Sequence, residues 1–132
     1  VFDFIKSLKK NPNELTILGD GSQYKSYFHV KDCMQAMVLL AKKLKGQEIQ
    51  GFFPINLGTN EGITVKESAN LIIKTLGLRP KFNFTGGKQG WIGDNPTIQL
   101  DISKAKQIGW NPKYTINESI IETTKWIDKN FY

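Results

Sequence analysis

The stretch LTILGDGSQYKSYFHVKDCMQAM, residues 15–37, contains most of the local signals that decide the fold of this chain. It begins with a short apolar and β-branched run, which favours a strand, and continues into a turn around Gly19 and Gly21. A second run of aromatic and β-branched residues, YFHV at 27–30, predicts another strand. After Asp32, which can cap a helix, apolar residues recur at helical spacing. We therefore expect strand, turn, strand and helix in succession.

The remainder of the chain alternates helical and strand signals. Two capping boxes, in which a threonine is followed three residues later by a glutamate, predict helices that start at Thr64 and Thr115. The first of these helices is expected to end at Gly77, because glycine commonly terminates helices. Further helices are expected at residues 1–10 and 103–108, and further strands at residues 52–57, 81–84 and 97–101. These elements make the chain a mixed α/β protein.

Two expectations concern how the predicted strands are surrounded. FFPINL, residues 52–57, is almost entirely apolar, as is usual for a strand that is buried on both faces. KFNF at 81–84 and TIQLD at 97–101 both alternate apolar and polar residues, and we expect them to pair antiparallel.

Size, composition and charge limit the possible functions. The 132 residues are sized for one folded domain, and the apolar runs are too short to cross a membrane. With no secretory leader and a single cysteine, Cys33, we expect a cytoplasmic protein without disulfides and without a zinc site. The net charge of +6 suggests nucleic acid, but Arg79 is the only arginine among 18 basic residues. Since bidentate recognition of guanine and phosphate requires arginine, we expect no nucleic-acid partner.

The sequence shows no catalytic constellation of its own. Tyr27 and Lys31 have the YxxxK spacing of a known catalytic pair, but on a strand they would lie about 13 Å apart, too far for the lysine to lower the tyrosine pKa. GDG at 19–21 lacks the third glycine and the following helix of a dinucleotide-binding loop, so a simple turn is favoured. His29 is expected to be a packed or hydrogen-bonded strand residue, and Cys33 a core residue. No cluster of metal-binding side chains is evident.

The loop TGGKQGWIGDNP, residues 85–96, is the remaining candidate for a binding function. A glycine-rich segment of this length is costly to order unless it is used. Trp91 can stack on a planar or sugar group, and Asp94 can accept hydrogen bonds from hydroxyls. Alternatively, Trp91 anchors the loop in the core, and both interpretations stay open at this point.

Three blocks in a fixed order give the chain a family resemblance. They are LTILGDGSQYKSYFHVKDCMQAM, then PINLGTN with ITVKESANLI, then GWIGDNP with QLDISKAKQIGWNPKYTINESIIET. Together they resemble the C-terminal part of extended short-chain dehydrogenases/reductases, namely NAD-dependent nucleotide-sugar epimerases and dehydratases of the UDP-glucose 4-epimerase type. The resemblance covers essentially the whole chain.

The resemblance implies a division of the chain. Residues 1–60 would be the end of the NAD-binding Rossmann-type domain, interleaved at 11–30 with the substrate lobe, and residues 61–132 would be mainly the small C-terminal substrate-binding lobe. The GxxGxxG loop and the catalytic YxxxK helix of the family belong to an N-terminal portion that is absent from residues 1–132. The whole enzyme would use NAD, whereas this chain would hold no catalytic and no cofactor-binding residue. A first helix that begins uncapped at Val1 fits this expectation.

The resemblance also implies four substrate-binding residues. Leu18 would lie against the nucleotide base, and Lys25 would bind the diphosphate where relatives usually carry an arginine. Lysine keeps the charge but loses the bidentate fork. Trp91 stands where many relatives carry a second arginine, and the loop around Trp91 and Asp94 would close over the nucleotide.

The resemblance leaves two alternatives open. An epimerase, which is an isomerase, is placed slightly ahead of a dehydratase or a reductase. A function of another class is a small basic α/β module that binds RNA or an acidic partner, but the chain lacks the aromatic signature of RNA-binding domains. Because Rossmann neighbours would be missing from the apolar surface, we also expect either a homo-oligomer or a first helix that packs over this surface, and the homo-oligomer is favoured.

Overall fold

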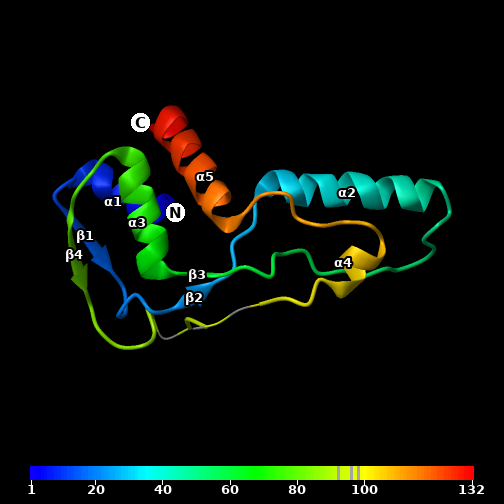
Figure 1. Cartoon of the computed structure of the whole chain (residues 1–132), viewed down its shortest axis with the longest axis horizontal. Coiled ribbons are helices and arrows are strands. Elements are labelled where there is room, and N and C mark those ends of the chain that lie inside the picture. The colour runs from blue at the N-terminus through cyan, green and yellow to red at the C-terminus, as the bar shows by residue number, and fades with distance from the viewer. Residues whose placement is uncertain (92, 96, 98) are drawn as a thin grey trace.

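A computed structural model describes residues 1–91, 93–95, 97 and 99–132. The elements in chain order are α1 (Phe2–Lys10), β1 (Glu14–Ile17), β2 (Tyr24–Lys25), α2 (Val30–Lys45), β3 (Ile63–Thr64), α3 (Val65–Leu76), β4 (Lys81–Phe84), α4 (Ser103–Gln107) and α5 (Ile116–Phe131). Helices α1, α3 and α5 gather with β1 and β4 at one end of the elongated molecule, and long extended segments connect this end to α2 and α4 (Figure 1). The predicted mixed α/β class is confirmed.

Strand pairing differs from the prediction. β4 pairs parallel with β1, with Leu15 opposite Phe82, so the expected antiparallel pairing of 81–84 with 97–101 is wrong. Leu15 is fully buried, and pairing along β1 allows Phe82 to pack against the same core. Of the segment 97–101, Thr97 forms a bridge with Tyr24 of β2, and Ile98 lies outside the described residues. β2 itself pairs antiparallel with β3.

The larger hydrophobic core lies between α1, β1, α3 and α5. Its fully buried side chains come from every one of these elements and include Ile5, Leu8, Leu15, Ile17, Ile72 and Ile120. Both predicted capping boxes are present: Thr64 and Glu67 begin α3, and Thr115 and Glu118 begin α5. Gly77 ends α3 in the left-handed conformation, as predicted. Local capping thus fixes where the two helices that flank this core begin.

A smaller core lies beside α2 and α4. Ala36, Ile102, Ala105 and Trp110 are buried in it, and Ile55 and Leu57 pack partly against it. The predicted strand at 52–57 is wrong: the segment is extended but forms no strand in the described structure, and Phe52 is 93% exposed. An apolar run becomes a strand only when a neighbouring strand satisfies its backbone, and no described segment does so here.

Helix α2 begins three residues earlier than predicted, with Val30 instead of Cys33 as its first residue. His29 is its N-cap, and the His29 Nδ1 atom accepts a hydrogen bond of 3.1 Å from the Lys31 backbone N–H. The predicted strand at 27–30 is therefore wrong, because β2 ends at Lys25 and Val30 is already helical. A ring nitrogen of histidine can replace the side-chain oxygen that usually caps a helix. His29 was not recognised as a cap because it lies in a run that also favours a strand.

Asp32, predicted to cap α2, instead joins the helix to a distant segment. The Asp32 side chain is fully buried, and its two carboxylate oxygens accept hydrogen bonds from the backbone N–H groups of Lys113 (3.0 Å) and Tyr114 (3.2 Å). The Trp110 indole N–H donates to the Asp32 backbone carbonyl at 3.0 Å. These contacts tie the first turn of α2 to the chain that leads into α5.

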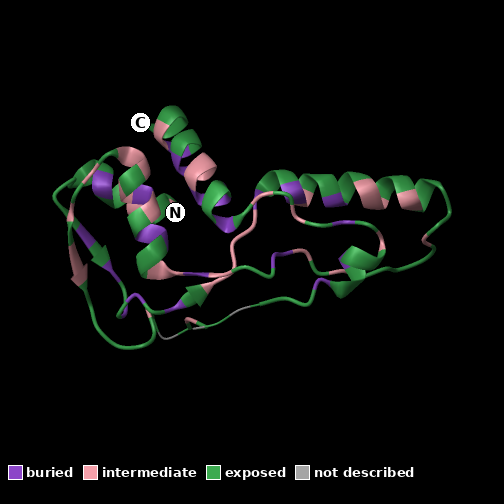
Figure 2. Cartoon of the chain, in the orientation of Figure 1, coloured by how far each residue is buried: buried purple, intermediate pink, exposed green. Residues whose placement is uncertain are grey.

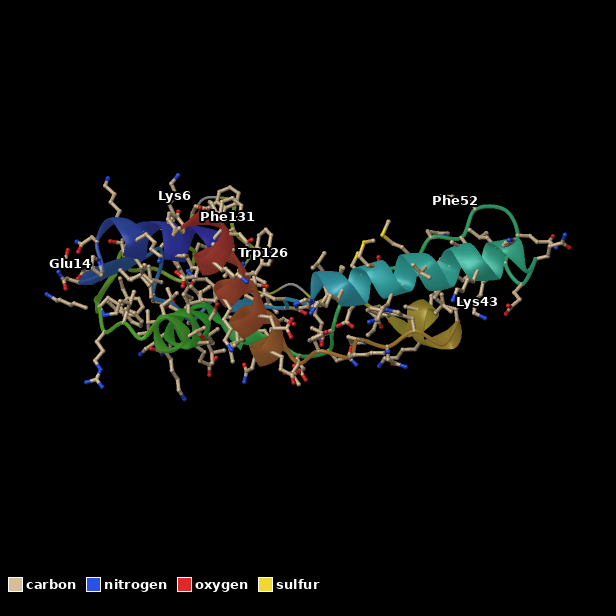
Figure 3. All side chains as sticks on the ribbon, turned by 90° about the horizontal axis from the view of Figure 1, so that it is seen from above. Lys6, Glu14, Lys43, Phe52, Trp126 and Phe131 are labelled. Atoms are coloured by element: carbon tan, nitrogen blue, oxygen red, sulfur yellow. The ribbon has the colours of Figure 1, made fainter. Side chains whose placement is uncertain are left out.

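Most of the apolar face of α2 is uncovered. Of the side chains predicted to face the core, only Ala36 is fully buried, and Cys33 is half-buried rather than a core residue. Figure 2 shows the buried residues concentrated on α1, α3 and α5, whereas α2 is mainly exposed. Phe52 projects at the α2 end, far from Trp126 and Phe131 (Figure 3). The large exposed apolar residues of α2 are Val30, Met34, Met37, Val38 and Leu44.

None of the described helices combines the length and the hydrophobicity that a membrane crossing requires.

The role of Asp32 leads to a stability prediction. Asp32→Ala leaves the Lys113 and Tyr114 N–H groups without their acceptors and should lower the free energy of unfolding by about 2–4 kcal/mol. Urea denaturation measures this change. The control is Glu48→Ala, which removes an exposed carboxylate paired with Lys43 and should cost less than about 1 kcal/mol. Equal effects of the two substitutions would contradict the structural role of Asp32.

The uncovered α2 face leads to a second prediction. We expect the 132-residue chain to self-associate through α2 and residues 52–57, because monomers rarely expose such large apolar patches. In sedimentation velocity, the double variant Met37→Gln/Phe52→Gln should shift the population toward monomer. Tyr132→Gln, which removes an exposed aromatic at the other end, should not. A parent chain that sediments only as a monomer would exclude this association.

Candidate functional site

Two of the four predicted substrate-binding residues, Lys25 and Asp94, form an ion pair, and a third, Trp91, lies on the same loop as Asp94. Lys25 lies on β2, and Asp94 and Trp91 lie on the loop that follows β4. The Lys25 Nζ atom is 2.6 Å from Asp94 Oδ1 and donates to the Asn95 carbonyl oxygen at 2.5 Å. The side chains of Lys25 and Asp94 are only 18% and 12% exposed, so most of the ion pair is withdrawn from water.

Backbone hydrogen bonds hold the loop against the turn that precedes Lys25. The Gly19 N–H donates to Thr85 Oγ1 (2.8 Å), and the Gly86 N–H donates back to the Gly19 carbonyl (3.0 Å). The Asp20 N–H donates to the Gly87 carbonyl (2.8 Å). Gly19 has a φ of +80°, which confirms the prediction of a tight turn at GDG. Leu18, the fourth predicted residue, directly precedes this turn.

Asp94 is held as a carboxylate by two donors. Asp94 Oδ2 accepts from the Gly90 N–H at 3.2 Å, while Oδ1 faces Lys25. The hydrogen bond from Lys25, and then that from the Gly90 N–H, lowers the pKa of Asp94 below its ordinary value. Burial, and then the negative charge of Asp94, raises the pKa of Tyr27. The negative charge of Asp94 therefore acts on Tyr27 as well as on Lys25.

Trp91 and Leu18 present apolar surface to solvent. Trp91 is 64% exposed and Leu18 is 54% exposed. The alternative that Trp91 anchors the loop in the core is therefore wrong. Gly93 lies against the indole so closely that a Cβ there would be 2.3 Å from the ring. Trp91 and Leu18 offer apolar surface to a flat ring. The Lys25 ammonium group, which contacts one carboxylate and one carbonyl oxygen of the loop, offers a cation to an anionic group. Together they can bind a molecule that carries both.

Tyr27 and Lys31 do not form a pair. No hydrogen bond between them occurs in the described part of the chain, which agrees with the prediction. The predicted reason was wrong, because neither residue lies on a strand: Tyr27 follows the end of β2, and Lys31 lies in the first turn of α2. Its Nζ atom binds Glu122 of α5 at 2.8 Å and lies 5.3 Å from the centre of the Tyr114 ring.

His29 is packed and hydrogen-bonded, as predicted, although it caps a helix. It is 6% exposed, its ring stacks on Tyr114 with the centroids 4.4 Å apart, and its Nε2 atom is 3.4 Å from Glu122. His29 and Glu122 border an apolar groove of about 590 Å³ between α5 and the start of α1 and α2. These contacts account for His29 as a structural residue.

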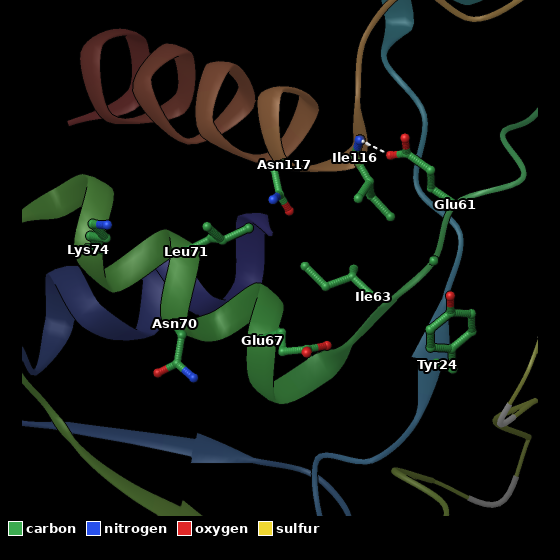
Figure 4. A pocket seen from close by; sticks show the side chains of 10 residues that line it. Tyr24, Glu61, Ile63, Glu67, Asn70, Leu71, Lys74, Ile116 and Asn117 are labelled. Carbon is green, nitrogen blue, oxygen red and sulfur yellow. Dashed lines mark hydrogen bonds between the residues drawn. The ribbon is translucent and has the colours of Figure 1, made fainter.

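A second depression, of about 640 Å³, lies between α3 and α5 (Figure 4). Its acidic side chains already bind backbone: Glu61 accepts from the Ile116 N–H at 2.8 Å, and Glu67 completes the cap of α3. It contains none of the predicted site residues. Within the described residues, no group of three histidine, cysteine or acidic side chains is placed to hold a metal ion.

Sequence analysis missed two features of the site. One is the direct contact of Lys25 with Asp94, which are 69 residues apart in the chain and have no local signal in common. The other is Gln23, whose side chain is almost completely buried beside Leu18. A buried glutamine cannot be recognised from a turn sequence in which most polar residues are exposed.

Comparison with known proteins places this geometry in a family context. Residues 1–58 match the model of the NAD dependent epimerase/dehydratase family. The whole chain is similar to a probable GDP-L-fucose synthase 1 of Oryza sativa subsp. japonica, with 29% identity over 96% of this chain and 36% of the relative. It is also similar to the dTDP-D-glucose 4,6-dehydratase of Homo sapiens, with 28% identity over 98% of this chain and 36% of the relative.

The fold is similar to that of part of a solved epimerase. A crystal structure of a UDP-galactose 4-epimerase superimposes with a TM-score of 0.82 at 30% identity, and covers 98% of this chain and 40% of the solved one. The resemblance to NAD-dependent nucleotide-sugar epimerases and dehydratases is therefore confirmed, and so is the Rossmann-type α/β class. The chain spans about 36% of the length of the curated relatives it matches.

The ion pair makes a titration prediction. Because Lys25 lowers the pKa of Asp94, Lys25→Met should move that pKa up toward the ordinary value of 3.8. The stability that the pair contributes is present above pH 3.8 and should be lost as the pH falls through the lowered pKa of the parent protein. NMR titration of the Asp94 carboxyl carbon measures both proteins. An unchanged Asp94 pKa in the variant would show that the contact is not formed in solution.

Proposed function

We propose that residues 1–132 form the substrate-binding portion of an NAD-dependent nucleotide-sugar epimerase or dehydratase, the portion that binds the nucleoside diphosphate. The observation that carries the proposal is the mostly buried Lys25 ammonium group, which contacts Asp94 on the loop that also approaches the exposed Leu18 at Gly90. The proposal keeps the division into residues 1–60, with substrate-lobe residues 11–30, and residues 61–132. It also keeps a cytoplasmic setting and a homo-oligomer.

Each residue has a role in this proposal. Lys25 donates hydrogen bonds to oxygen atoms of the diphosphate, and Leu18 packs on the nucleobase. Asp94 accepts hydrogen bonds from sugar hydroxyls, and Trp91 covers the nucleotide from the loop. The names of the relatives support the substrate class, since they specify GDP-, dTDP- and UDP-linked sugars and have the nucleoside diphosphate in common.

Lys25 can bind a phosphate without giving up its protein partners. An ammonium group has three N–H donors. Two of them are directed at Asp94 and Asn95 in the described structure. The third donor remains for a ligand oxygen, so Asp94 positions the ammonium group while part of its charge is offset. A single charge-assisted hydrogen bond of this kind contributes roughly 1.5–3 kcal/mol.

In this proposal, the GDG turn of this chain is not a site for NAD. The GDG turn is bonded to the 85–87 backbone, and the space where a Cβ of Gly19 would lie is occupied by the Gln23 amide. This turn therefore cannot cradle a pyrophosphate in the manner of a dinucleotide-binding loop. In the proposal, NAD and the reacting tyrosine belong to the portion of the relatives that this chain does not span, and the isomerase chemistry depends on that portion. Binding rather than turnover is therefore the property to measure.

The test is calorimetric titration of the 132-residue chain with UDP. Lys25→Met should weaken binding about 10- to 100-fold, because one charge-assisted contact is lost. The matched control is Lys43→Met, since Lys43 is also paired with a carboxylate at 2.6 Å but lies at the far end of α2. Lys43→Met should bind UDP like the parent.

Trp91→Ala separates the loop from the cation. Because Trp91 is mostly exposed, this variant should keep the thermal stability of the parent while its affinity for UDP falls. Parent-like affinity of Lys25→Met would show that the diphosphate does not bind at this position. No detectable binding of UDP, GDP or dTDP to the parent would reject the proposed function.

A further inference from the structure

The side chain of Gln23 carries a buried hydrogen-bond acceptor that has no donor. Gln23 lies between β1 and β2 and is 2% exposed. Its Nε2 atom donates to the Leu18 carbonyl oxygen at 3.1 Å. Its Oε1 atom is buried and, among the residues that the structure describes, has no hydrogen-bond partner. An acceptor left in this way costs about 1–3 kcal/mol, so its presence beside a candidate binding site requires a reason.

The orientation of this carboxamide is fixed. Exchanging its nitrogen and oxygen would place two acceptors, Oε1 and the Leu18 carbonyl, against each other. A Cβ on Gly19 would lie 1.9 Å from Nε2, and a Cβ on Gly90 would lie 3.5 Å from it, so the amide is held between two glycines. The Gln23 backbone carbonyl accepts from the Val65 N–H at 2.9 Å, which anchors the residue to the start of α3. Oε1 is therefore a preorganised acceptor rather than one end of a freely rotating amide.

The Gln23 carboxamide lies at the end of the site where the base is expected. The Gln23 amide contacts the backbone of Leu18, the residue that packs on the nucleobase in the proposed function. Gly90, whose Cβ would be 3.5 Å from both Leu18 Cβ and Gln23 Nε2, covers the same place from the loop. The Gly90 N–H in turn binds Asp94, the partner of Lys25. Base end and diphosphate end are thus joined through one short stretch of backbone.

We propose that Gln23 determines which nucleobase this site accepts, through an Oε1 atom that accepts a hydrogen bond from a ring N–H of the base. Uracil and thymine carry such a proton on N3, and guanine carries one on N1. Cytosine N3 and adenine N1 have no proton and are acceptors themselves, so they would face Oε1 as acceptor against acceptor. The site then favours uridine, thymidine and guanosine diphosphates over cytidine and adenosine diphosphates. This inference rests on the proposed function.

Two further observations fit the proposal. The relatives described above are named for GDP-, dTDP- and UDP-sugars, and these three bases have the ring N–H in common. In addition, the loop that approaches the Gln23 amide at Gly90 has further glycines at 86 and 87, and both of these have a φ of +83°. A base reaches Oε1 by taking the place of the Gly90 backbone over Leu18, and glycines allow that backbone to move without side-chain clashes.

The experiment compares five nucleoside diphosphates by calorimetry: UDP, dTDP, GDP, CDP and ADP. The parent chain should bind UDP at least about tenfold more tightly than CDP, since one hydrogen bond is replaced by an acceptor pair. Gln23→Met keeps the length of the side chain but has no strong acceptor, and it should bind UDP and CDP with similar affinity. Gln89→Met is the matched control, because Gln89 is an exposed glutamine of the 85–96 loop. This variant should keep the preference for UDP.

A ligand variant makes the test independent of the folding of Gln23→Met. 3-Methyluridine 5′-diphosphate lacks the N3 proton and should bind the parent at least about tenfold more weakly than UDP. The inference is overturned if the parent binds CDP as tightly as UDP, or if Gln23→Met keeps the preference for UDP. It is also overturned if the methylated ligand binds like UDP. A parent that binds all five ligands equally contradicts only this inference, whereas a parent that binds none contradicts the proposed function as well.

Discussion

The buried Asp32 carboxylate is the contact on which the arrangement of the two cores depends. The larger core holds α1, α3 and α5 together, and the smaller one holds α2 to α4. Between them the chain runs mostly as extended segments (Figure 1). Asp32 binds the backbone N–H groups of Lys113 and Tyr114 immediately before α5 begins. Because a buried carboxylate must be fully hydrogen-bonded, this contact permits one position of α2 relative to the start of α5.

The candidate site likewise depends on hydrogen bonds between backbone segments that are far apart in the sequence. The turn at 19–20 and the loop at 85–87 exchange hydrogen bonds, so the loop carrying Asp94 lies beside the strand carrying Lys25. Parallel pairing of β1 with β4 brings these two segments together, because the turn follows β1 and the loop follows β4 at the same edge. The candidate binding residues therefore come from two regions, more than 60 residues apart, that one pair of strands aligns.

Local signals predicted the helices well and the strands poorly. The capping boxes at Thr64 and Thr115 and the glycine stop at Gly77 are each completed within a few residues, so the sequence alone contains the whole interaction. A strand also needs a partner, and neither the sequence of 52–57 nor that of 27–30 indicates whether a partner is present. The apolar run of 52–57 remains unpaired in the described structure, and 27–30 enters a helix capped by His29.

The site itself was only partly predictable for the same reason. Leu18, Lys25, Trp91 and Asp94 could be named from their places in the family motifs, and the structure brings Lys25 and Asp94 into contact and exposes Leu18 and Trp91. The orphaned acceptor of Gln23 could not be named, because an unsatisfied atom is a property of the packed surroundings and not of a motif.

The charge of the site indicates how its recognition is divided. Lys25 and Asp94 together carry no net charge, and Trp91 adds none where many relatives carry a second arginine. In the proposed function, a diphosphate therefore meets one positioned donor instead of a strongly positive pocket, and electrostatics alone gives weaker binding than a pair of arginine forks would. More of the binding free energy must then come from the base and ribose, which are the groups that Leu18, Gln23, Trp91 and Asp94 surround in the proposed function. In the proposed function, the modest positive charge of the site thus leaves more of the selectivity to the contacts with the base.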